Sequence, residues 1–578
     1  MRLAHVTSFA AALTAARTAA RTAARTAART AGLTAALTAA LTVAGCAAKP
    51  ASPDAAGPLD AALDAPIDAP PAPLTCAERG LTESPWSDGP YGVLRGELAD
   101  DFTVARVGGG SWSLREAWTG CDSVVVVPDL LVTSSLDATP LWERDLDLLV
   151  ATSTPNVRYL FISRSANSDN ARAMAAAMQA RIDALLGTLT AADAHWWRDR
   201  LIVVDGRAAT LDNWVSGVLS SHGRFGFAVD RGQRVRGMGM LADVTRYVQA
   251  LSDAGEWPWE NNLAYVANEA RYFDAQAEQQ ARLDADGATI VSLFAGETLM
   301  EQATTEVALP DAATMAGFDT LEIEVTLDCP TRTTPELGNC GAWDYLAHLF
   351  VTEGTGEVEV ARFITPYHRG AHWVVDATAA LPWLRAGGAR SFRWSFAPSW
   401  NTQPTRTHLS LRLSNRARGV TPALAVPLYT GGGFGSGYNV SRMPIDVPIP
   451  ADAARVDLVV IVTGHGAATN DCAEFCNHQH RFTVAGQAHE VAFPEAGTLE
   501  GCIAAIDGGE TPNQGGTWWF GRGGWCPGAP VAPHVLDVTA DVTPGTIATV
   551  SYEGLFANQT PPDGSGDIVL SSWLVIYR

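Results

Sequence analysis

The sequence predicts a multidomain protein in which an N-terminal α/β domain precedes two all-β domains. From residue 76 to 285, apolar runs of strand length alternate with helical patterns. After residue 285, short β-type runs separated by Gly, Pro and Asn continue to Arg578. A chain of 578 residues is also long enough for about three domains.

The α/β domain is expected to span residues 76–285. Its predicted strands are Ser123–Val127, Tyr159–Ile162, Leu201–Val204 and Phe225–Val229. Helical patterns rich in apolar residues cover 170–186 and Leu241–Leu251. This alternation indicates a sheet covered by helices.

The second half is expected to form two β-sandwich or jelly-roll domains, at residues 286–435 and 436–578. Its predicted strands include Thr320–Thr326, Leu346–Thr352, Glu357–Ile364, His408–Leu413, Ala454–Val462, His480–Val484 and Ile568–Tyr577. Turn residues cluster between these runs, as in Gly431–Gly437.

The N-terminus indicates export. Residues 1–45 contain arginines at a four-residue repeat, then the apolar run Leu33–Val43 and the small residues before Cys46. This order is typical of a secretory signal, and Val-Ala-Gly before Cys46 resembles a bacterial lipoprotein signal in which Cys46 carries the lipid. A plain signal peptide or a short membrane anchor is the alternative, although the apolar run is short for a membrane span. The arginine repeat is unusual for a signal and leaves a misplaced start codon open.

Residues 46–75 form a Pro/Ala/Asp tract without apolar periodicity, which predicts a disordered tether. We therefore expect an exported lipoprotein at the outer membrane or cell surface, held to the membrane through its lipid only.

Charge and composition exclude some functions. The net charge of −22 makes nucleic acid and anionic membrane surfaces poor partners. Lys49, in the tether, is the only lysine, which excludes lysine Schiff-base or general-base chemistry in the folded part.

The cysteine count supports a disulfide framework. Without Cys46, eight of the nine cysteines remain, and an even number in an exported chain favours four disulfides. Sequence order suggests pairing of neighbours, although spacing alone leaves other connectivities open. The pairs expected are Cys76–Cys121, Cys329–Cys340, Cys472–Cys476 and Cys502–Cys526. Zinc is the alternative at Cys472 and Cys476, with His478 and His480 nearby, but the spacing favours a disulfide.

Two of these cysteine pairs each present one acid. Asp344 follows Cys340 closely, and Glu474 lies at the centre of the Cys472–Cys476 loop. In the chain-entropy model so small a loop contributes about 2 kcal/mol, against about 3.5 kcal/mol for a loop as long as Cys502–Cys526. The small loop is better suited to holding one carboxylate in place, as a catalytic site requires.

Four segments of the first half form a further pattern, at Ala99–Thr103, Trp112–Arg115, Trp118–Cys121 and Phe227–Gly232. On these segments residues 95–255 resemble thioredoxin-like redoxin domains. Redox chemistry in that family needs a second cysteine, which the Cys121-Asp122-Ser123-Val124 segment lacks. A structural or partner-binding role is therefore expected.

Four motifs in the second half occur in the order known from one enzyme family. They are Cys340–Asp344, Arg362–Tyr367, Cys472–Cys476 and Arg522–Gly528. On these motifs residues 290–578 resemble the peptide-N-glycosidase F family, whose amidases remove whole N-glycans from asparagine. The resemblance implies two eight-stranded jelly rolls side by side, with the active site in the cleft between them.

The resemblance also implies roles for individual residues. Asp344 falls on the family's principal catalytic carboxylate, Glu474 on a second essential acid, and Arg522 on the arginine that holds the first. Further substrate-binding or orienting positions are His465, Tyr367, Trp525 and Trp400. Tyr367 and Trp525 could instead be core aromatics.

Chemistry is consistent with these roles. Amide hydrolysis needs an activated water and a proton for the leaving nitrogen, which two acids of different pKa can divide between them. We expect Arg522 to keep Asp344 ionised for water activation, while Glu474 positions water or the sugar–amide linkage. No cofactor or metal is required.

The sequence departs from the family at three positions. The family's third acid, which helps to bind sugars next to the linkage, has no counterpart in Phe396–Trp400. Tyr345 stands where the family has arginine, and Phe475 replaces a tryptophan.

Three functions follow. The first is a monomeric amidase that releases N-glycans from glycoproteins, giving aspartate and a glycosylamine. The second is an inactive relative that only binds glycan or glycoprotein. The third is a copper monooxygenase-like protein, because His478 and His480 lie on one face of a predicted strand.

Overall fold

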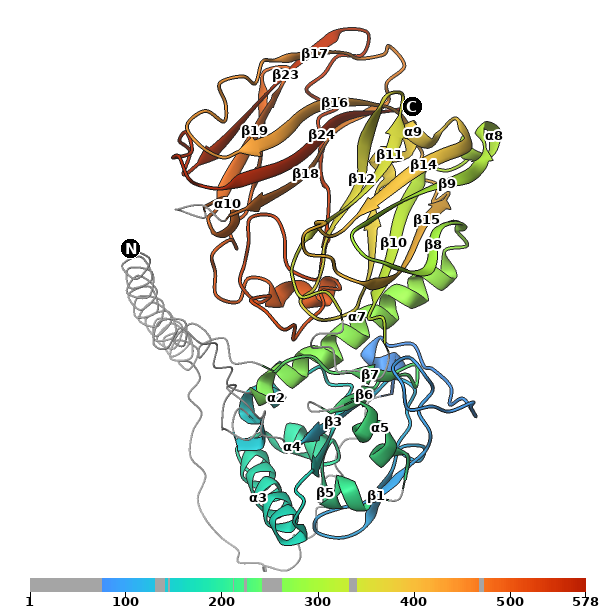
Figure 1. The fold of residues 1–578 in the computed structure, drawn as a ribbon, viewed down its shortest axis with the longest axis vertical. Coiled ribbons are helices and arrows are strands. Elements are labelled where there is room, and N and C mark those ends of the chain that lie inside the picture. Colours follow the sequence, from blue (N-terminus) through green and yellow to red (C-terminus); the bar gives the residue numbers. More distant parts are fainter. Residues whose placement is uncertain are drawn as a thin grey trace, which may run out of the picture. The chain divides into compact units, whose positions relative to one another are not determined.

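The computed structural model describes residues 75–129, 141–143, 146–211, 213–222, 226–241, 262–331, 340–466 and 472–578. It shows a multidomain, mostly β protein (Figure 1). The predicted signal, Cys46, the tether and nearly all of the predicted helix Leu241–Leu251 lie outside these residues. Among the helices within them, none has the length and apolar character to cross a membrane.

The α/β region contains a five-stranded mixed sheet in the order β5-β4-β3-β6-β7. The strands are β3 (Ser123–Pro128), β4 (Val157–Ser163), β5 (Leu201–Arg207), β6 (Phe227–Val229) and β7 (Val235–Gly237). Strands β3, β4 and β5 are parallel, and β6–β7 is an antiparallel hairpin. The continuous apolar runs of β3 and β4 follow from burial of the sheet on both faces.

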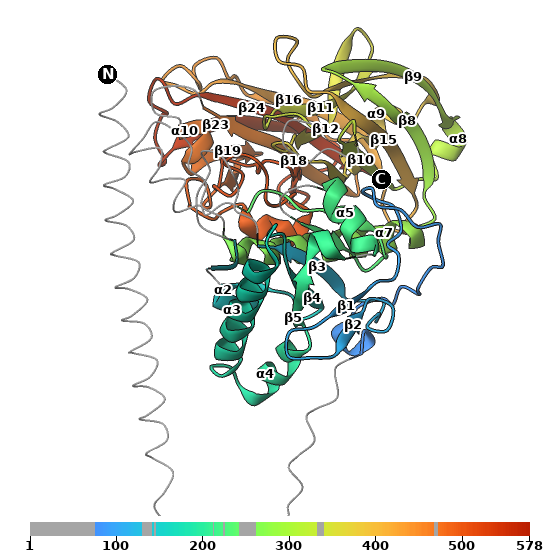
Figure 2. The ribbon, with the colours of Figure 1, turned by 60° about the horizontal axis from the view of Figure 1, so that its bottom comes forward.

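Helices cover the two faces of this sheet. The α3 helix (Ser168–Leu186) and the α5 helix (Trp214–His222) lie on opposite faces in both views (Figures 1 and 2). The α3 helix begins after Asn167, whose side chain accepts hydrogen bonds from two backbone N–H groups of the first turn. Shorter elements complete the region: β1 (Thr103–Ala105), β2 (Ser111–Ser113), α2 (Leu146–Thr152) and α4 (Ala191–Arg198).

The first β region is a sandwich of two antiparallel sheets. One sheet has the order β13-β10-β15-β8 and the other β12-β11-β14-β9. The strands are β8 (Thr289–Leu299), β9 (Gln302–Asp311), β10 (Thr320–Asp328), β11 (Leu346–Glu353), β12 (Gly356–Ile364), β13 (Ala371–Asp376), β14 (Gly387–Ser395) and β15 (Thr405–Ser414). Two short helices, α8 (Ala312–Met315) and α9 (Leu381–Leu384), connect them.

The second β region repeats this arrangement. Its sheets have the orders β16-β24-β18-β22 and β17-β23-β19-β20. The strands are β16 (Pro422–Gly433), β17 (Ile445–Pro448), β18 (Arg455–His465), β19 (His478–Val484), β20 (Gln487–Ala492), β22 (His534–Asp537), β23 (Ile547–Phe556) and β24 (Asp567–Tyr577). By position along the chain, both regions pair their strands as 1-8-3-6 and 2-7-4-5.

A short strand of the second region extends a sheet of the first. Strand β21 (Pro530–Val531) pairs antiparallel with β12, opposite Phe363 and Arg362. This pairing brings the segment after Arg522 against the motif strand Arg362–Ile364, and so joins two of the sequence motifs.

The longest described helix, α7 (Val266–Ala285), was not predicted individually. Its Glu269 is fully buried and accepts hydrogen bonds from Gly239 N–H, Arg369 Nη1 and Asn513 Nδ2, at 2.9, 3.0 and 2.9 Å. Asn513 belongs to the loop that carries Arg522, and Arg369 follows the first motif strand. One carboxylate therefore ties α7 to both β regions.

We expect Glu269→Ala to lower the free energy of unfolding by about 3–5 kcal/mol, because it leaves Arg369 buried without its carboxylate. Chemical denaturation followed by tryptophan fluorescence measures the change. Glu278→Ala, on an exposed part of the same helix, is the matched control and should stay within about 0.5 kcal/mol of the parent. Equal losses in the two variants would contradict this role of Glu269.

Candidate functional site

The backbone on either side of Asp344 is held by hydrogen bonds to Thr365. The Cys329–Cys340 disulfide is formed, and the chain then runs to Trp343 and Asp344 ahead of β11. Thr365, from the second motif, donates its hydroxyl to Trp343 O at 2.6 Å and accepts from Tyr345 N–H at 2.8 Å. Hydrogen bonds on both sides thus fix the peptide groups that flank Asp344.

Glu474 lies in the four-residue helix α10 (Cys472–Phe475), closed by the Cys472–Cys476 disulfide. Its Oε2 accepts from Gly466 N–H at 3.0 Å, and its backbone oxygen accepts from Gly523 N–H at 2.7 Å. A Cβ at Gly523 would lie 2.5 Å from Ala473 O and 2.2 Å from the His478 ring, so only glycine allows this approach. The disulfide and these contacts hold the carboxylate in one position.

Arg522 joins the two acids. Its Nε lies 3.1 Å from Glu474 Oε1 and its Nη2 lies 3.6 Å from Asp344 Oδ2. The remaining donors bind the loop itself, at Thr517 O, Phe520 O and Thr517 Oγ1, over 2.9–3.0 Å. Its side chain is 1% exposed. Only the planar, five-donor guanidinium can make these contacts together, so lysine is not an equivalent residue here.

The loop around Arg522 is closed by the Cys502–Cys526 disulfide. With Cys76–Cys121, all four predicted pairs are present, and the expected disulfide framework is confirmed. The zinc alternative at Cys472 and Cys476 is wrong, because these sulfurs are bonded to each other.

Burial dominates the electrostatics of the two acids. The pKa of Asp344 is raised, because loss of solvation outweighs the opposing effects of Arg522 and of a hydrogen bond from Tyr367. The pKa of Glu474 is also raised, by burial and by repulsion from Asp344, against the effect of Arg522. Arg522 does lower the pKa of Asp344, as expected, but burial outweighs this effect. Its 3.6 Å contact is too long for a hydrogen bond.

The aromatic residues predicted for the site divide into two groups. Tyr367 is buried, its pKa is raised well above the usual value by burial and by Asp344, and its hydroxyl therefore stays protonated as a donor to Asp344. Trp525 is buried as well, lying 4.7 Å from the Arg522 guanidinium. It stacks on His465, with ring centroids 4.9 Å apart. Tyr367 thus contacts Asp344 directly, Trp525 contacts Arg522, and His465 packs on Trp525.

Trp400 behaves differently. It is 78% exposed and contacts the ring of Tyr345 edge-on, with centroids 6.0 Å apart. Trp343, directly before Asp344, is 51% exposed and was not predicted as a site residue. Two large aromatic rings are therefore accessible in the neighbourhood of Asp344, where sugar rings could stack.

The two histidines proposed for copper are buried in the core of the second sandwich. His478 Nδ1 contacts His480 Nε2 at 2.8 Å, and the outer nitrogens contact Ala473 O at 2.9 Å and Tyr552 OH at 2.7 Å. All four ring nitrogens have partners within the protein. These imidazoles are not arranged to ligate a metal.

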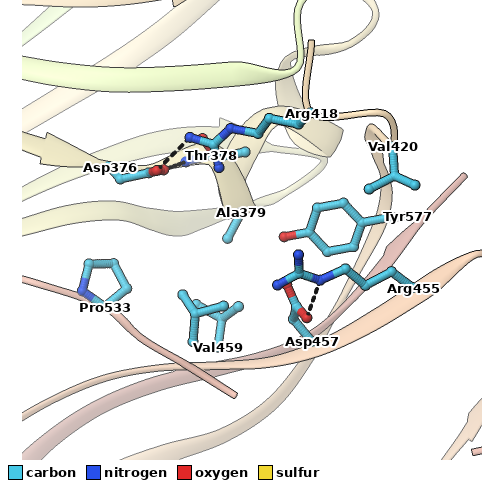
Figure 3. Close-up of a pocket in the computed structure, with 11 residues that line it drawn as sticks. Asp376, Thr378, Ala379, Arg418, Val420, Arg455, Asp457, Val459, Pro533 and Tyr577 are labelled. Carbon is cyan, nitrogen blue, oxygen red and sulfur yellow. Dashed lines mark hydrogen bonds and ion pairs between the residues drawn. The ribbon is translucent and has the colours of Figure 1, made fainter. Parts of the chain in front are cut away.

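A separate cavity of about 150 Å³ lies between residues of the two sandwiches (Figure 3). Two ion pairs line it, Asp376–Arg418 at 3.0 Å and Asp457–Arg455 at 2.8 Å, together with Tyr577. Asp344, Glu474 and Arg522 do not contribute to its lining. It is therefore distinct from the cluster of acids.

Sequence reasoning missed two groups near the site. Glu359 and Arg362 form a buried ion pair at 2.7 Å, although Arg362 had been noted only as part of a motif. Glu510, within the loop of Arg522, is buried, and neither of its carboxyl oxygens has a hydrogen-bond partner among the described residues. Neither stands out in the sequence, because burial of both follows from contacts between distant segments.

Comparison with known proteins supports the motif resemblance. Residues 435–575 match the family model described as Peptide-N-glycosidase F, C terminal. Peptide-N(4)-(N-acetyl-beta-D-glucosaminyl)asparagine amidase F of Elizabethkingia miricola is 24% identical over 302 residues, which cover 48% of this chain and 79% of that protein.

Solved structures give weaker similarities. PNGase F from Flavobacterium meningosepticum is 18% identical with a TM-score of 0.39, over 50% of this chain and 96% of that chain. PNGF-II is 14% identical with a TM-score of 0.36, over 61% of this chain and 74% of that chain.

The pH dependence of the protein's stability should reveal the ionisation of Glu510. Burial raises its pKa well above the ordinary 4.5, so the folded protein binds a proton that the unfolded chain has lost. The stabilising contribution is complete below pH 4.5 and is lost as the pH rises toward the folded pKa. We expect Glu510→Gln to be more stable than the parent at neutral pH and to lose less stability from pH 5 to 8.

Thermal unfolding midpoints across that range measure the effect. Glu500→Gln, at an exposed position of the same loop region, should follow the parent curve. A Glu510→Gln curve parallel to the parent would show that this carboxyl does not titrate on unfolding.

Proposed function

We propose, from the match of residues 435–575 to the family model and from the similarity to a known amidase, that this protein is a peptide-N4-(N-acetyl-β-glucosaminyl)asparagine amidase. The strand orders 1-8-3-6 and 2-7-4-5 support two eight-stranded jelly rolls as the scaffold. The mixed sheet of residues 76–285, with its terminal antiparallel hairpin, supports a thioredoxin-like domain without redox cysteines.

One observation carries the proposal: Asp344 and Glu474, 130 positions apart in the sequence, meet at the guanidinium of Arg522. Two partly buried acids that share one cation compete for its charge, so their ionisation is coupled. Such a pair can hold one proton and one negative charge at the same time, as acid–base catalysis requires.

The contacts divide the roles. Glu474 receives direct hydrogen bonds from Arg522 Nε and Gly466 N–H, which favours its ionised form and fixes its position. Asp344 is contacted more weakly, and its raised pKa makes it a stronger base than an ordinary aspartate. We assign water activation to Asp344 and orientation of the water and linkage to Glu474.

The reaction then proceeds by addition and elimination. Asp344 takes a proton from water as the water oxygen attacks the asparagine side-chain carbonyl. The C–N bond breaks when that proton reaches the leaving nitrogen. The products are aspartate in the polypeptide and a glycosylamine, and Asp344 returns to its initial state.

The substrates would be N-glycoproteins or glycopeptides met outside the cell. The predicted lipid at Cys46 and the tether would hold a monomeric enzyme at the outer membrane or cell surface. The exposed rings of Trp343 and Trp400 are suited to stacking on sugars near the linkage.

A glycan-binding protein without turnover is the second candidate. It is favoured by the segment Phe396–Trp400, which lacks the acid that the family uses beside the linkage while it retains an exposed tryptophan. The two candidates differ in whether the parent protein changes asparagine to aspartate.

We expect Asp344→Asn to lower glycan release from a denatured glycoprotein by about 10²–10⁴-fold, the usual contribution of a general base. Mass spectrometry of the peptides would detect conversion of asparagine to aspartate. Asp376→Asn is the matched control, since Asp376 is also paired with an arginine but lines the separate cavity. A parent that leaves all glycan types attached would refute the amidase and favour the binding protein.

The pH profile gives an independent check. Because burial raises the pKa of Asp344, the acidic limb of kcat/KM should lie above the 3.8 of an ordinary aspartate. Activity should fall as the pH drops through that limb, because the base becomes protonated. A limb at or below pH 3.8, measured with a glycopeptide substrate, would contradict this assignment of the base.

A further inference from the structure

A chain of buried hydrogen bonds runs from β12 of the first sandwich to His465 beside the acids. It starts at the fully buried Arg362, whose Nε and Nη2 donate to the two oxygens of Glu359 at 2.8 and 2.7 Å. The Nη1 of Arg362 donates to Thr463 Oγ1 at 2.9 Å and to Val569 O at 2.7 Å. Thr463 Oγ1 in turn lies 2.8 Å from His465 Nε2.

Donor and acceptor chemistry fixes the direction of this chain. A guanidinium only donates, so Thr463 Oγ1 must accept from Arg362. The single hydroxyl hydrogen of Thr463 then needs an acceptor, since Thr463 is fully buried. Among the described contacts of this hydroxyl, the remaining partner is His465 Nε2. Nitrogen Nε2 must therefore lack a proton.

The charge state of His465 agrees with this. Burial and the nearby Arg362, His348 and Arg522 lower the pKa of His465 to about 3, so the ring is neutral at neutral pH. A neutral imidazole with an unprotonated Nε2 carries its hydrogen on Nδ1. Within the described part of the chain, no hydrogen bond to Nδ1 is found.

His465 is close to the acids. Its ring stacks on Trp525, whose other contacts include Arg522 at 4.7 Å, and the next residue, Gly466, donates to Glu474. We propose that Arg362 and Thr463 are positioning residues that fix His465 as the neutral Nδ1–H tautomer, and that His465 donates this hydrogen to a carbonyl oxygen of the substrate. The second part rests on the proposed amidase function.

Such a donor has a clear chemical use. A neutral N–H group stabilises an amide oxygen as negative charge develops on it, and it does not give up its proton to the acids nearby. A protonated histidine would instead add a third positive charge beside Arg362 and Arg522. At the other end of this chain of hydrogen bonds, the negative charge of Glu359 balances the positive charge of Arg362.

Nitrogen NMR of the 15N-histidine-labelled protein tests the tautomer without requiring turnover. We expect the parent to show His465 with a protonated Nδ1 and an unprotonated Nε2. Thr463→Val removes the hydroxyl with little change of shape and should move the proton to Nε2, wholly or in part. Thr463→Ser keeps the hydroxyl and should restore the parent spectrum. The buried pair His478 and His480 provides unchanged reference signals in all three proteins.

Kinetics on a glycopeptide test the role. Thr463→Val should lower kcat about tenfold with little change in KM, because one hydrogen bond in the transition state is lost, whereas Thr463→Ser should stay near the parent. A parent spectrum with Nε2 protonated would overturn the proposal, as would a Thr463→Val protein with unchanged tautomer and unchanged kcat. A parent inactive on every glycopeptide would refute the amidase and the donor role, and the spectra would still decide the tautomer.

Discussion

The site depends on one buried guanidinium held between two carboxylates. Arg522 is shielded from water by the surrounding protein. Without it, burying the charge of Asp344 or Glu474 would cost much more free energy. The three groups therefore constrain each other, and the surrounding chain is arranged to keep them together. Asp344 and Arg522 lie on loops beside a disulfide, and Glu474 lies in the short helix α10, which a third disulfide closes. None of these disulfides needs to contribute much to global stability for this purpose. Their local effect is to restrict the conformations of the segments that carry Asp344, Glu474 and Arg522.

The β scaffold supplies direction as well as support. Side chains two residues apart on a strand share a face, so Thr463 and His465 at the end of β18 point the same way. Thr463 meets Arg362 from the other sandwich, and the residue after His465 contacts Glu474. Strand β21 pairs with β12 beside Arg362. The junction of the two sandwiches is thus polar and hydrogen-bonded near the site, where precise placement matters more than the free energy of burial.

Much of this could be predicted from the sequence. Strands β3, β4 and β5 were located because buried parallel strands are continuous apolar runs. The order of the cysteines in the sequence predicted all four disulfides. Asp344 and Glu474 could be chosen because each lies beside or within a cysteine pair and because the motifs around them match those of a known family. The long helix α7 and the buried Glu269 and Glu510 could not be, because their environments depend on contacts between segments that are far apart in sequence. Local pattern reports local structure, whereas burial of a charged group is a property of the assembled fold.

The pKa of Asp344 also depends on burial that the local sequence does not reveal. Placing an arginine beside an aspartate suggests a lowered pKa, and that inference needs only the motif. The sign depends on distance and solvation, which the motif does not contain. At 3.6 Å, with Glu474 closer to the same guanidinium, Arg522 offsets only part of the cost of burying a second negative charge. The burial that raises the pKa of Asp344 also makes it a better base, so the same loss of solvation that opposes its ionisation suits hydrolysis.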